Sequence, residues 1–153
     1  MMNRRVLLVT AACSATVSGV ALATSPTAAQ AAVGKPAPAF EAIDSSKTRR
    51  SLAEFKGKPV VLEWTSPSCP FAKAQYTSGR MPELQKWARQ SGVIWLTLLS
   101  SHPSRADYLE PERAETFNRA RGGMPSALLI DARGVVGAAY GAMTANHMFI
   151  VSK

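Results

Sequence analysis

The chain has 153 residues with 18 lysines and arginines against 10 aspartates and glutamates, which gives a formal charge of +8. This length corresponds to one domain, and 46% hydrophobic with 18% charged residues suits a single packed core rather than a disordered tail or a coiled coil. Two cysteines are too few for a disulfide-stapled mini-protein or a four-cysteine zinc site. The basic residues are scattered and do not alternate with stacking aromatics, so we expect no nucleic-acid partner.

The first residues have the pattern of an export signal. Arg4 and Arg5 give a positive start, residues 6–23 carry no charge, and Ala29-Gln30-Ala31 fits the A-x-A pattern that signal peptidase reads. The uncharged stretch contains Thr, Ser and Gly and falls short of the ~20 mostly apolar residues that span a bilayer. The sequence therefore predicts a cleaved signal peptide and no stable membrane span.

We predict a signal peptide over residues 1–31 and one mature domain over residues 32–153, exported to the periplasm or the extracellular space. Cys13 has the place of a lipoprotein cysteine, but the residues before it lack the leucine that such signals carry. After cleavage, Cys69 is the only cysteine, so no intramolecular disulfide can form.

Strand and helix patterns alternate along the predicted mature domain. In chain order they are a strand at 40–43, a polar turn at 45–50, a short helix at 51–57, a strand at 59–64, a helix from 71 that breaks near 79, a helix at 82–90, strands at 93–99 and 126–130 on either side of a helix at 112–121, a turn at 131–134, and a strand at 147–151. The strands at 59–64 and 93–99 are nearly continuous apolar runs, typical of strands buried on both faces. This alternation predicts an α/β domain with a mostly parallel sheet.

Cys69 lies where a predicted buried strand gives way to a predicted helix. Chemistry in open α/β sheets favours that edge. A thiol at a helix N-terminus faces unpaired N–H groups and the positive end of the helix dipole, which stabilise the thiolate, and Lys73 adds positive charge one turn on. Because the thiolate is the nucleophile, this placement predicts thiol chemistry. The alternative is a buried, inert cysteine, against which the polar neighbours Ser66 and Ser68 argue.

Several segments resemble redoxin-type thioredoxin-fold proteins of the alkyl hydroperoxide reductase and thiol-specific antioxidant group. Residues 33–40 (VGKPAPAF) and 51–64 (SLAEFKGKPVVLEW) match the opening of that family, and residues 68–71 (SCPF) and 140–149 (YGAMTANHMF) are similar to its exported peroxiredoxin-like members. The resemblance implies a thioredoxin-like α/β fold with a mixed, mostly parallel central sheet flanked by helices. It also implies a further strand and helix beyond Lys153, so that the chain would be truncated.

The resemblance assigns the nucleophilic or peroxidatic cysteine to Cys69. Ser66 matches the threonine or serine that hydrogen-bonds the peroxide and the thiolate, with an ordinary loop serine as the equal alternative, and Thr65 and Pro70 are site-loop residues beside them. The second cysteine of a C-x-x-C pair would stand where this chain has Ala72. An oxidised Cys69 must therefore be resolved by an outside thiol or by a second copy of the chain.

The cis-proline of the family, which packs against the active cysteine, has no proline counterpart at the matching position. That position is Asn146, and since a non-proline cis bond costs ~2.5–4 kcal/mol we expect a trans peptide and an altered loop. Pro125, before the predicted strand at 126–130, is a competing match. We prefer Asn146 because residues 140–149 fit the family better.

We therefore predict a thiol-dependent oxidoreductase or antioxidant protein that needs no cofactor or metal. Cys69 would reduce a peroxide, or exchange a disulfide of a protein or small molecule, with an external thiol as reductant. The alternative from another class is a catalytically silent thioredoxin-fold binding module, or a fragment, in which the loop at Asn146 contacts a partner. A copper chaperone using Cys69, His147 and two methionines is less favoured, because such chaperones usually carry two cysteines. A hydrolase with a Cys–His–Asn site is a further alternative, and it would need Cys69, His147 and Asn146 to converge in space.

Overall fold

The computed structural model describes residues 30–153. Residues 1–29, with most of the predicted signal peptide and Cys13, lie outside the described part. Within it, no helix combines the length and the hydropathy needed to cross a membrane.

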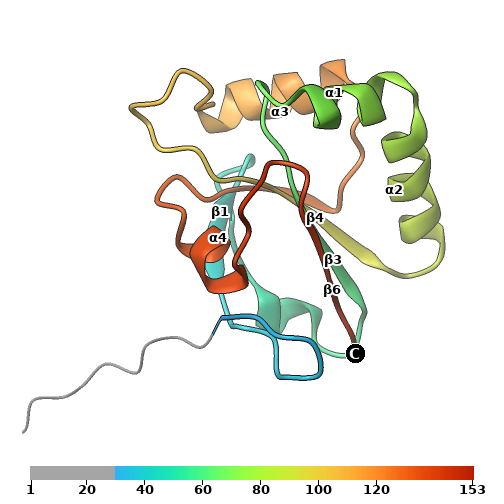
Figure 1. Cartoon of the computed structure of the whole chain (residues 1–153). Helices are drawn as coiled ribbons and strands as arrows, with labels where there is room; N and C mark the ends of the chain where they lie inside the picture. The colour runs from blue at the N-terminus through green and yellow to red at the C-terminus, as the bar shows by residue number, and fades with distance from the viewer. Residues whose placement is uncertain (1–29) are drawn as a thin grey trace, which may run out of the picture.

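The described residues form six strands, four α-helices and one short 3₁₀ helix, η1 (Figure 1). In chain order these are β1 (Glu41–Asp44), β2 (Arg49–Ser51), η1 (Leu52–Phe55), β3 (Val60–Trp64), α1 (Pro70–Thr77), α2 (Arg80–Gln90), β4 (Ile94–Leu99), α3 (Pro111–Ala120), β5 (Ala127–Ile130), α4 (Val135–Tyr140) and β6 (Met148–Val151).

The strands form one sheet in the order β2-β1-β5-β4-β3-β6. β3 pairs in parallel with β4, and β4 with β5, whereas β1 joins β5 and β6 joins β3 in antiparallel fashion. The predicted thioredoxin-like α/β fold with a mixed sheet and flanking helices is confirmed. Its parallel part is limited to the three central strands, because β1 and β6, which flank them, run in the opposite direction.

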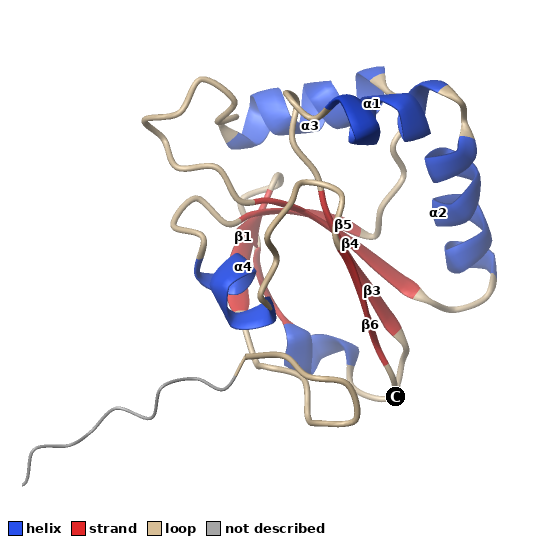
Figure 2. Cartoon of the chain, viewed as in Figure 1, coloured by secondary structure: helices blue, strands red, loops and turns tan. Residues whose placement is uncertain are grey.

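Two layers of helix cover the sheet (Figure 2). The face with α1, α2 and α3 buries Tyr76, Ala88 and Trp95 in one cluster and Ala114 with Leu128 in another. The opposite face, under α4 and η1, holds the main core. Its buried members are Phe40, Val60, Leu62, Trp64, Leu96, Leu98, Leu129, Val136 and Tyr140. Successive residues of the central strands point to opposite faces, and both faces are covered, which explains the continuous apolar runs.

The predicted elements recur within a few residues of their expected bounds, with two omissions. β2 was predicted as a turn, because its three residues show no apolar alternation. It is held instead by pairing with β1 and by ion pairs from Arg49 to Glu41 and from Arg50 to Asp44. The six residues of α4 gave no helical pattern, and Gly137 in its middle disfavours helix. That glycine packs on the core, where an added Cβ would lie 3.4 Å from Ser100 Oγ.

Candidate functional site

Cys69 is the residue at which the loop after β3 turns into α1. It is the N-cap of the helix, with an extended backbone (φ −82°, ψ 112°), and Pro70 takes the first helical position, where no N–H is needed. The half-buried sulfur accepts a hydrogen bond from Ala72 N at 3.5 Å. Cys69 is the only cysteine of the described chain and is free. The sulfur therefore lies at the helix end where backbone N–H groups and the positive end of the helix dipole are found.

Ser66 lies three residues before the cysteine, but its hydroxyl is turned to a different partner. The side chain is 7% exposed, and its Oγ donates a 2.9 Å hydrogen bond to Asp107 Oδ2. Ser66 Oγ also lies 2.9 Å from Ser68 Oγ and accepts a hydrogen bond from Ser68 N. Within residues 30–153, no hydrogen bond joins Ser66 Oγ to the sulfur. The two residues meet only through the backbone, where Cys69 N donates to Ser66 O at 3.2 Å.

Asp107 comes from the long loop between β4 and α3, and sequence analysis did not single it out. The Ser66 hydroxyl, with smaller contributions from Ser101 and then Ser68, holds the pKa of Asp107 below its ordinary value, although burial opposes this shift. Its other oxygen, Oδ1, lies 3.6 Å from Arg105 Nε. A carboxylate is a stronger acceptor than a neutral thiol, which explains why the serine faces Asp107.

Thr65 anchors a second residue that the sequence did not reveal, Arg121 at the C-terminal end of α3. Arg121 Nη1 donates to Thr65 Oγ1 at 2.8 Å, and Nη2 lies 3.5 Å from Asn118 Oδ1. The guanidinium carbon lies 3.6 Å from the centre of the Tyr76 ring and 4.4 Å from that of Phe117. Burial lowers the pKa of Arg121. The spacing of Phe117 and Arg121, four residues apart, was the one available signal, because such residues share a helix face.

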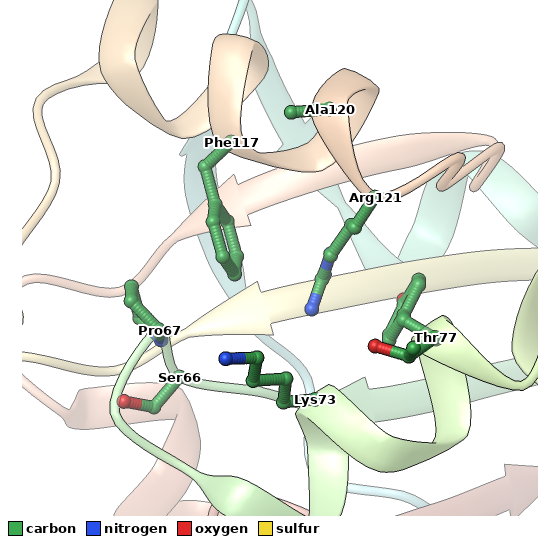
Figure 3. A pocket seen from close by; sticks show the side chains of 8 residues that line it. Ser66, Pro67, Lys73, Thr77, Phe117, Ala120 and Arg121 are labelled. Atoms are coloured by element: carbon green, nitrogen blue, oxygen red, sulfur yellow. The ribbon is translucent and has the colours of Figure 1, made fainter.

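A cavity of about 580 Å³ opens between α1, α3 and the start of the cysteine loop (Figure 3). Its lining residues are Ser66, Pro67, Lys73, Tyr76, Thr77, Phe117, Ala120 and Arg121. Figure 3 shows the Lys73 and Arg121 side chains extending into the same space from opposite elements.

Glu63 is a buried carboxylate in the middle of β3, 2% exposed, beneath α1 and α2. It accepts hydrogen bonds from Tyr76 Oη at 2.8 Å, Gln85 Nε2 at 3.1 Å, Trp95 Nε1 at 2.8 Å and Thr97 Oγ1 at 2.9 Å. All four donors are neutral. Burial and the adjoining Glu63 raise the pKa of Tyr76 well above its ordinary value of 10.0. The sequence signal was present, since Glu63 is the one charge inside an otherwise apolar strand.

The loop before β6 lies beside the cysteine loop, because β6 is the antiparallel neighbour of β3. Trp64 N donates to His147 O at 2.9 Å, and residues 142–145 share a cavity wall with residues 64–66.

Asn146, in the same loop, is exposed and lines a separate small cavity with Trp64 and Ala72. Pro125 precedes β5 instead, and β4 separates β5 from β3. Asn146 thus precedes the strand next to β3, whereas Pro125 does not, and its match to the proline of the family stays a prediction. The described residues contain no cis peptide bond.

His147 is the histidine considered above for metal binding and for hydrolysis. Within residues 30–153, no three His, Cys, Asp or Glu side chains lie close enough together to hold a metal ion. The centre of the His147 ring lies 4.6 Å from that of the Phe149 ring, with the two planes tilted by 43°. In the part of the chain that the structure describes, the buried Nδ1 of His147 has no hydrogen-bond partner.

This sheet order and the cysteine at the start of α1 define a thioredoxin-like protein. The AhpC/TSA family model matches residues 33–153, and the chain belongs to that family. Among curated proteins, no sequence matches it.

Solved structures show the same fold. An uncharacterized conserved protein from Geobacillus kaustophilus is 23% identical with a TM-score of 0.68, covering 76% of this chain and 61% of its own. A hypothetical protein from Sinorhizobium meliloti 1021 is 24% identical with a TM-score of 0.68, covering 79% and 65%. A secreted Mycobacterium tuberculosis disulfide oxidoreductase homologous to E. coli DsbE is 22% identical with a TM-score of 0.54, covering 74% and 83%. The chain thus spans less than two thirds of the first two proteins.

Proposed function

We propose that this protein is a thiol-dependent oxidoreductase whose nucleophile is the Cys69 thiolate. The observation that carries the proposal is the sulfur at the N-cap of α1, partly exposed and accepting a hydrogen bond from Ala72 N. Membership in the AhpC/TSA family supports it, as does the likeness to a secreted disulfide oxidoreductase.

Disulfide exchange is the chemistry that the described geometry supports best. The thiolate attacks one sulfur of a disulfide, a new S–S bond forms to Cys69, and the other sulfur leaves as a thiolate. Because position 72 is alanine, an external thiol must then attack the mixed disulfide and release Cys69. Disulfides of a protein or a small molecule satisfy this scheme.

Peroxide reduction is the second candidate, and family membership favours it. The thiolate would attack one peroxide oxygen, the O–O bond would break, and Cys69 would become a sulfenic acid. An external thiol would then condense with the sulfenic acid, with loss of water, to a mixed disulfide, and a second thiol would release Cys69. We rank it second because the Ser66 hydroxyl, which would hydrogen-bond the peroxide, donates to Asp107 instead.

A single experiment tests the proposal and ranks its two forms. The purified protein is mixed in parallel with glutathione disulfide and with hydrogen peroxide, and mass spectrometry follows the adduct on Cys69. A rate well above that of the urea-denatured chain is expected, larger for the disulfide, with no adduct in Cys69→Ser. Equal rates in the folded and denatured chains would contradict the enzyme hypothesis. They would favour a silent binding module in which Asn146 and its loop contact a partner.

Export to the periplasm or beyond is part of the same proposal. The A-x-A triplet that ends at Ala31 supports it, and the Mycobacterium tuberculosis neighbour is a secreted protein. N-terminal sequencing of the protein recovered from its host is expected to begin at or near Ala32. A start at the initiator methionine would contradict the prediction.

A further inference from the structure

The cavity between α1 and α3 carries two cations and no acidic side chain among its lining residues. Lys73 reaches it from α1 and Arg121 from the end of α3, as Figure 3 shows. Its other walls include the rings of Tyr76 and Phe117. A volume of about 580 Å³ is typical of sites for small organic ligands. The composition of the walls thus fits an anion that carries apolar surface.

Arg121 is fixed in place before any ligand arrives. Thr65 holds Nη1, and the guanidinium lies between the Tyr76 and Phe117 rings. Among the described residues, its buried Nε has no hydrogen-bond partner. A guanidinium has five N–H groups, so Arg121 keeps donors free for an acceptor, and an oriented planar fork suits a carboxylate.

The cavity is lined by residues on both sides of Cys69 in the chain, although Cys69 itself is not among its lining residues. Lys73 is one helical turn beyond Cys69, with Lys73 N donating to Cys69 O at 3.0 Å. Ser66 and Pro67, from the loop that leads to Cys69, form its opposite wall. A small molecule that binds here would present its remaining atoms at the mouth of the cysteine loop.

We propose that this cavity binds the carboxylate of a small organic disulfide, or of the thiol that reduces the protein, while the sulfur of that molecule reacts at Cys69. The inference rests on the proposed function and names its substrate class. Arg121 and Lys73 are specificity-determining residues in this scheme, since they bind the substrate and take no part in bond exchange.

Two aromatic disulfides of similar size test the proposal. One is 5,5′-dithiobis(2-nitrobenzoate), which carries two carboxylates, and the other is 4,4′-dithiodipyridine, which is neutral at pH 7.5. In each case Cys69 displaces one aromatic thiolate, which is followed by absorbance, and the S–S bond passes to the protein. The quantity of interest is the anionic-to-neutral rate ratio, divided by the same ratio for the urea-denatured chain. Lys73 is close to Cys69 in the sequence and can attract the anionic probe even in the unfolded chain. The division removes this contribution from the ratio.

Arg121→Gln is expected to lower this normalised ratio by about ten-fold, the loss of a desolvated charge pair. Lys73→Gln, at an exposed residue, is expected to lower it by about two- to five-fold. Arg119→Gln is the matched control, because it removes a charge from the exposed face of α3 outside the cavity, and it should leave the ratio unchanged.

The outcomes separate the two proposals. If both probes react no faster with the folded than with the denatured chain, the oxidoreductase proposal fails. If both react faster but neither Arg121→Gln nor Lys73→Gln changes the normalised ratio, only the carboxylate site is overturned. If the far-ultraviolet circular dichroism of Arg121→Gln shows that this variant is unfolded, the result for Lys73→Gln alone decides whether the carboxylate site exists. Lys73 is exposed, so its replacement should not prevent folding. If folded Arg121→Gln reacts more slowly with both probes by the same factor, Arg121 has only a structural role and the proposal is overturned.

Discussion

Two carboxylates lie on either side of the Cys69 loop, and their surroundings differ. Glu63 is in the sheet and receives four hydrogen bonds from neutral donors on α1, α2 and β4. Asp107 is in a loop and receives hydroxyl hydrogen bonds from Ser66 and Ser68, with Arg105 nearby. The first network joins secondary-structure elements across the core, whereas the second joins two loops at the surface.

The difference indicates two separate tasks. A buried carboxylate whose donors come from three elements fixes how those elements pack, because most of these donors would lose their acceptor without it. A carboxylate that binds two hydroxyls of the cysteine loop fixes only the shape of that loop. Mutations at Glu63 should therefore act on the stability of the whole domain, and mutations around Asp107 on a smaller, local scale.

The largest effect is expected for Glu63→Leu. The change removes the acceptor of the Tyr76, Trp95 and Thr97 donors, while Gln85 Nε2 keeps Tyr76 Oη as a partner. It should lower the free energy of unfolding by about 3–5 kcal/mol. Urea denaturation followed by tryptophan fluorescence measures this. Glu63→Gln is the matched variant, because its amide oxygen can keep most of the hydrogen bonds and should cost only about 1–2 kcal/mol.

Equal costs for the two Glu63 variants would show that the negative charge, not the hydrogen bonding, is what the network needs. A loss no larger than that of Glu41→Gln, at an exposed site on β1, would contradict the structural role altogether. In that case Glu63 would not stabilise the domain more than Asp107 does, and the proposed difference between the two carboxylates would be wrong.

Asp107→Asn should cost about 1–2 kcal/mol at pH 7, since it weakens hydrogen bonds to a charged acceptor. Its pH dependence has a definite sign. The folded state holds the pKa of Asp107 below its ordinary value of 3.8. The stabilisation is therefore fully present above that value and is lost as the pH falls through the folded pKa. Urea denaturation between pH 7 and pH 2.5 should show the wild-type protein and the variant converging on the acid side.

A constant gap between the two proteins down to pH 2.5 would contradict the assigned role of Asp107. Ser66→Ala supplies a second check through a double-mutant cycle. Because the two side chains share one hydrogen bond, their effects should be non-additive by about 0.5–1 kcal/mol.

The contrast between the networks also shows what the sequence could predict. The position of Cys69 follows from local patterns, an apolar run that ends in a Pro- and Ser-rich loop before a helix. The break between α1 and α2 was also visible, because Gly79 adopts a left-handed φ of 78° there. Glu63 stood out as a lone charge in a buried strand, but its partners come from other elements and only the packed fold identifies them.

Asp107 and Arg121 could not be found in this way. They lie 41 and 56 residues from their partners Ser66 and Thr65, and no periodic pattern connects sites so far apart. The position of Asn146 was predicted only through the family resemblance, because local rules alone would have chosen Pro125.

Tyr76→Phe is expected to have an intermediate effect, a loss of about 1 kcal/mol at pH 7 for one removed hydrogen bond. It should also change the alkaline limb of the stability curve. Burial and Glu63 raise the pKa of Tyr76 above its ordinary value of 10.0. The wild-type protein therefore keeps this stabilisation below pH 10 and loses it as the pH rises further. Tyr140→Phe is the control, because burial raises the pKa of Tyr140 to about 12 without a carboxylate partner.

Each tyrosine variant should lose stability less steeply than the wild-type protein above pH 10, as measured by urea denaturation up to pH 11. An unchanged slope in Tyr76→Phe would show that the phenol ionises equally well in the folded and unfolded chains. That result would remove the evidence for a dry network around Glu63.

The smallest effect is expected for Ser68→Ala. Ser68 is exposed, and its Oγ is 3.3 Å from Asp107 Oδ2 while the stronger contact from Ser66 remains. The free energy of unfolding should change by no more than about 0.5 kcal/mol, as is usual at exposed positions. If Ser68→Ala cost as much as Asp107→Asn, Ser68 would be the principal partner of the carboxylate. The loop network would then depend on its exposed hydroxyl rather than on the buried Ser66, and the Ser66 hydroxyl would be free to turn toward a peroxide bound at Cys69.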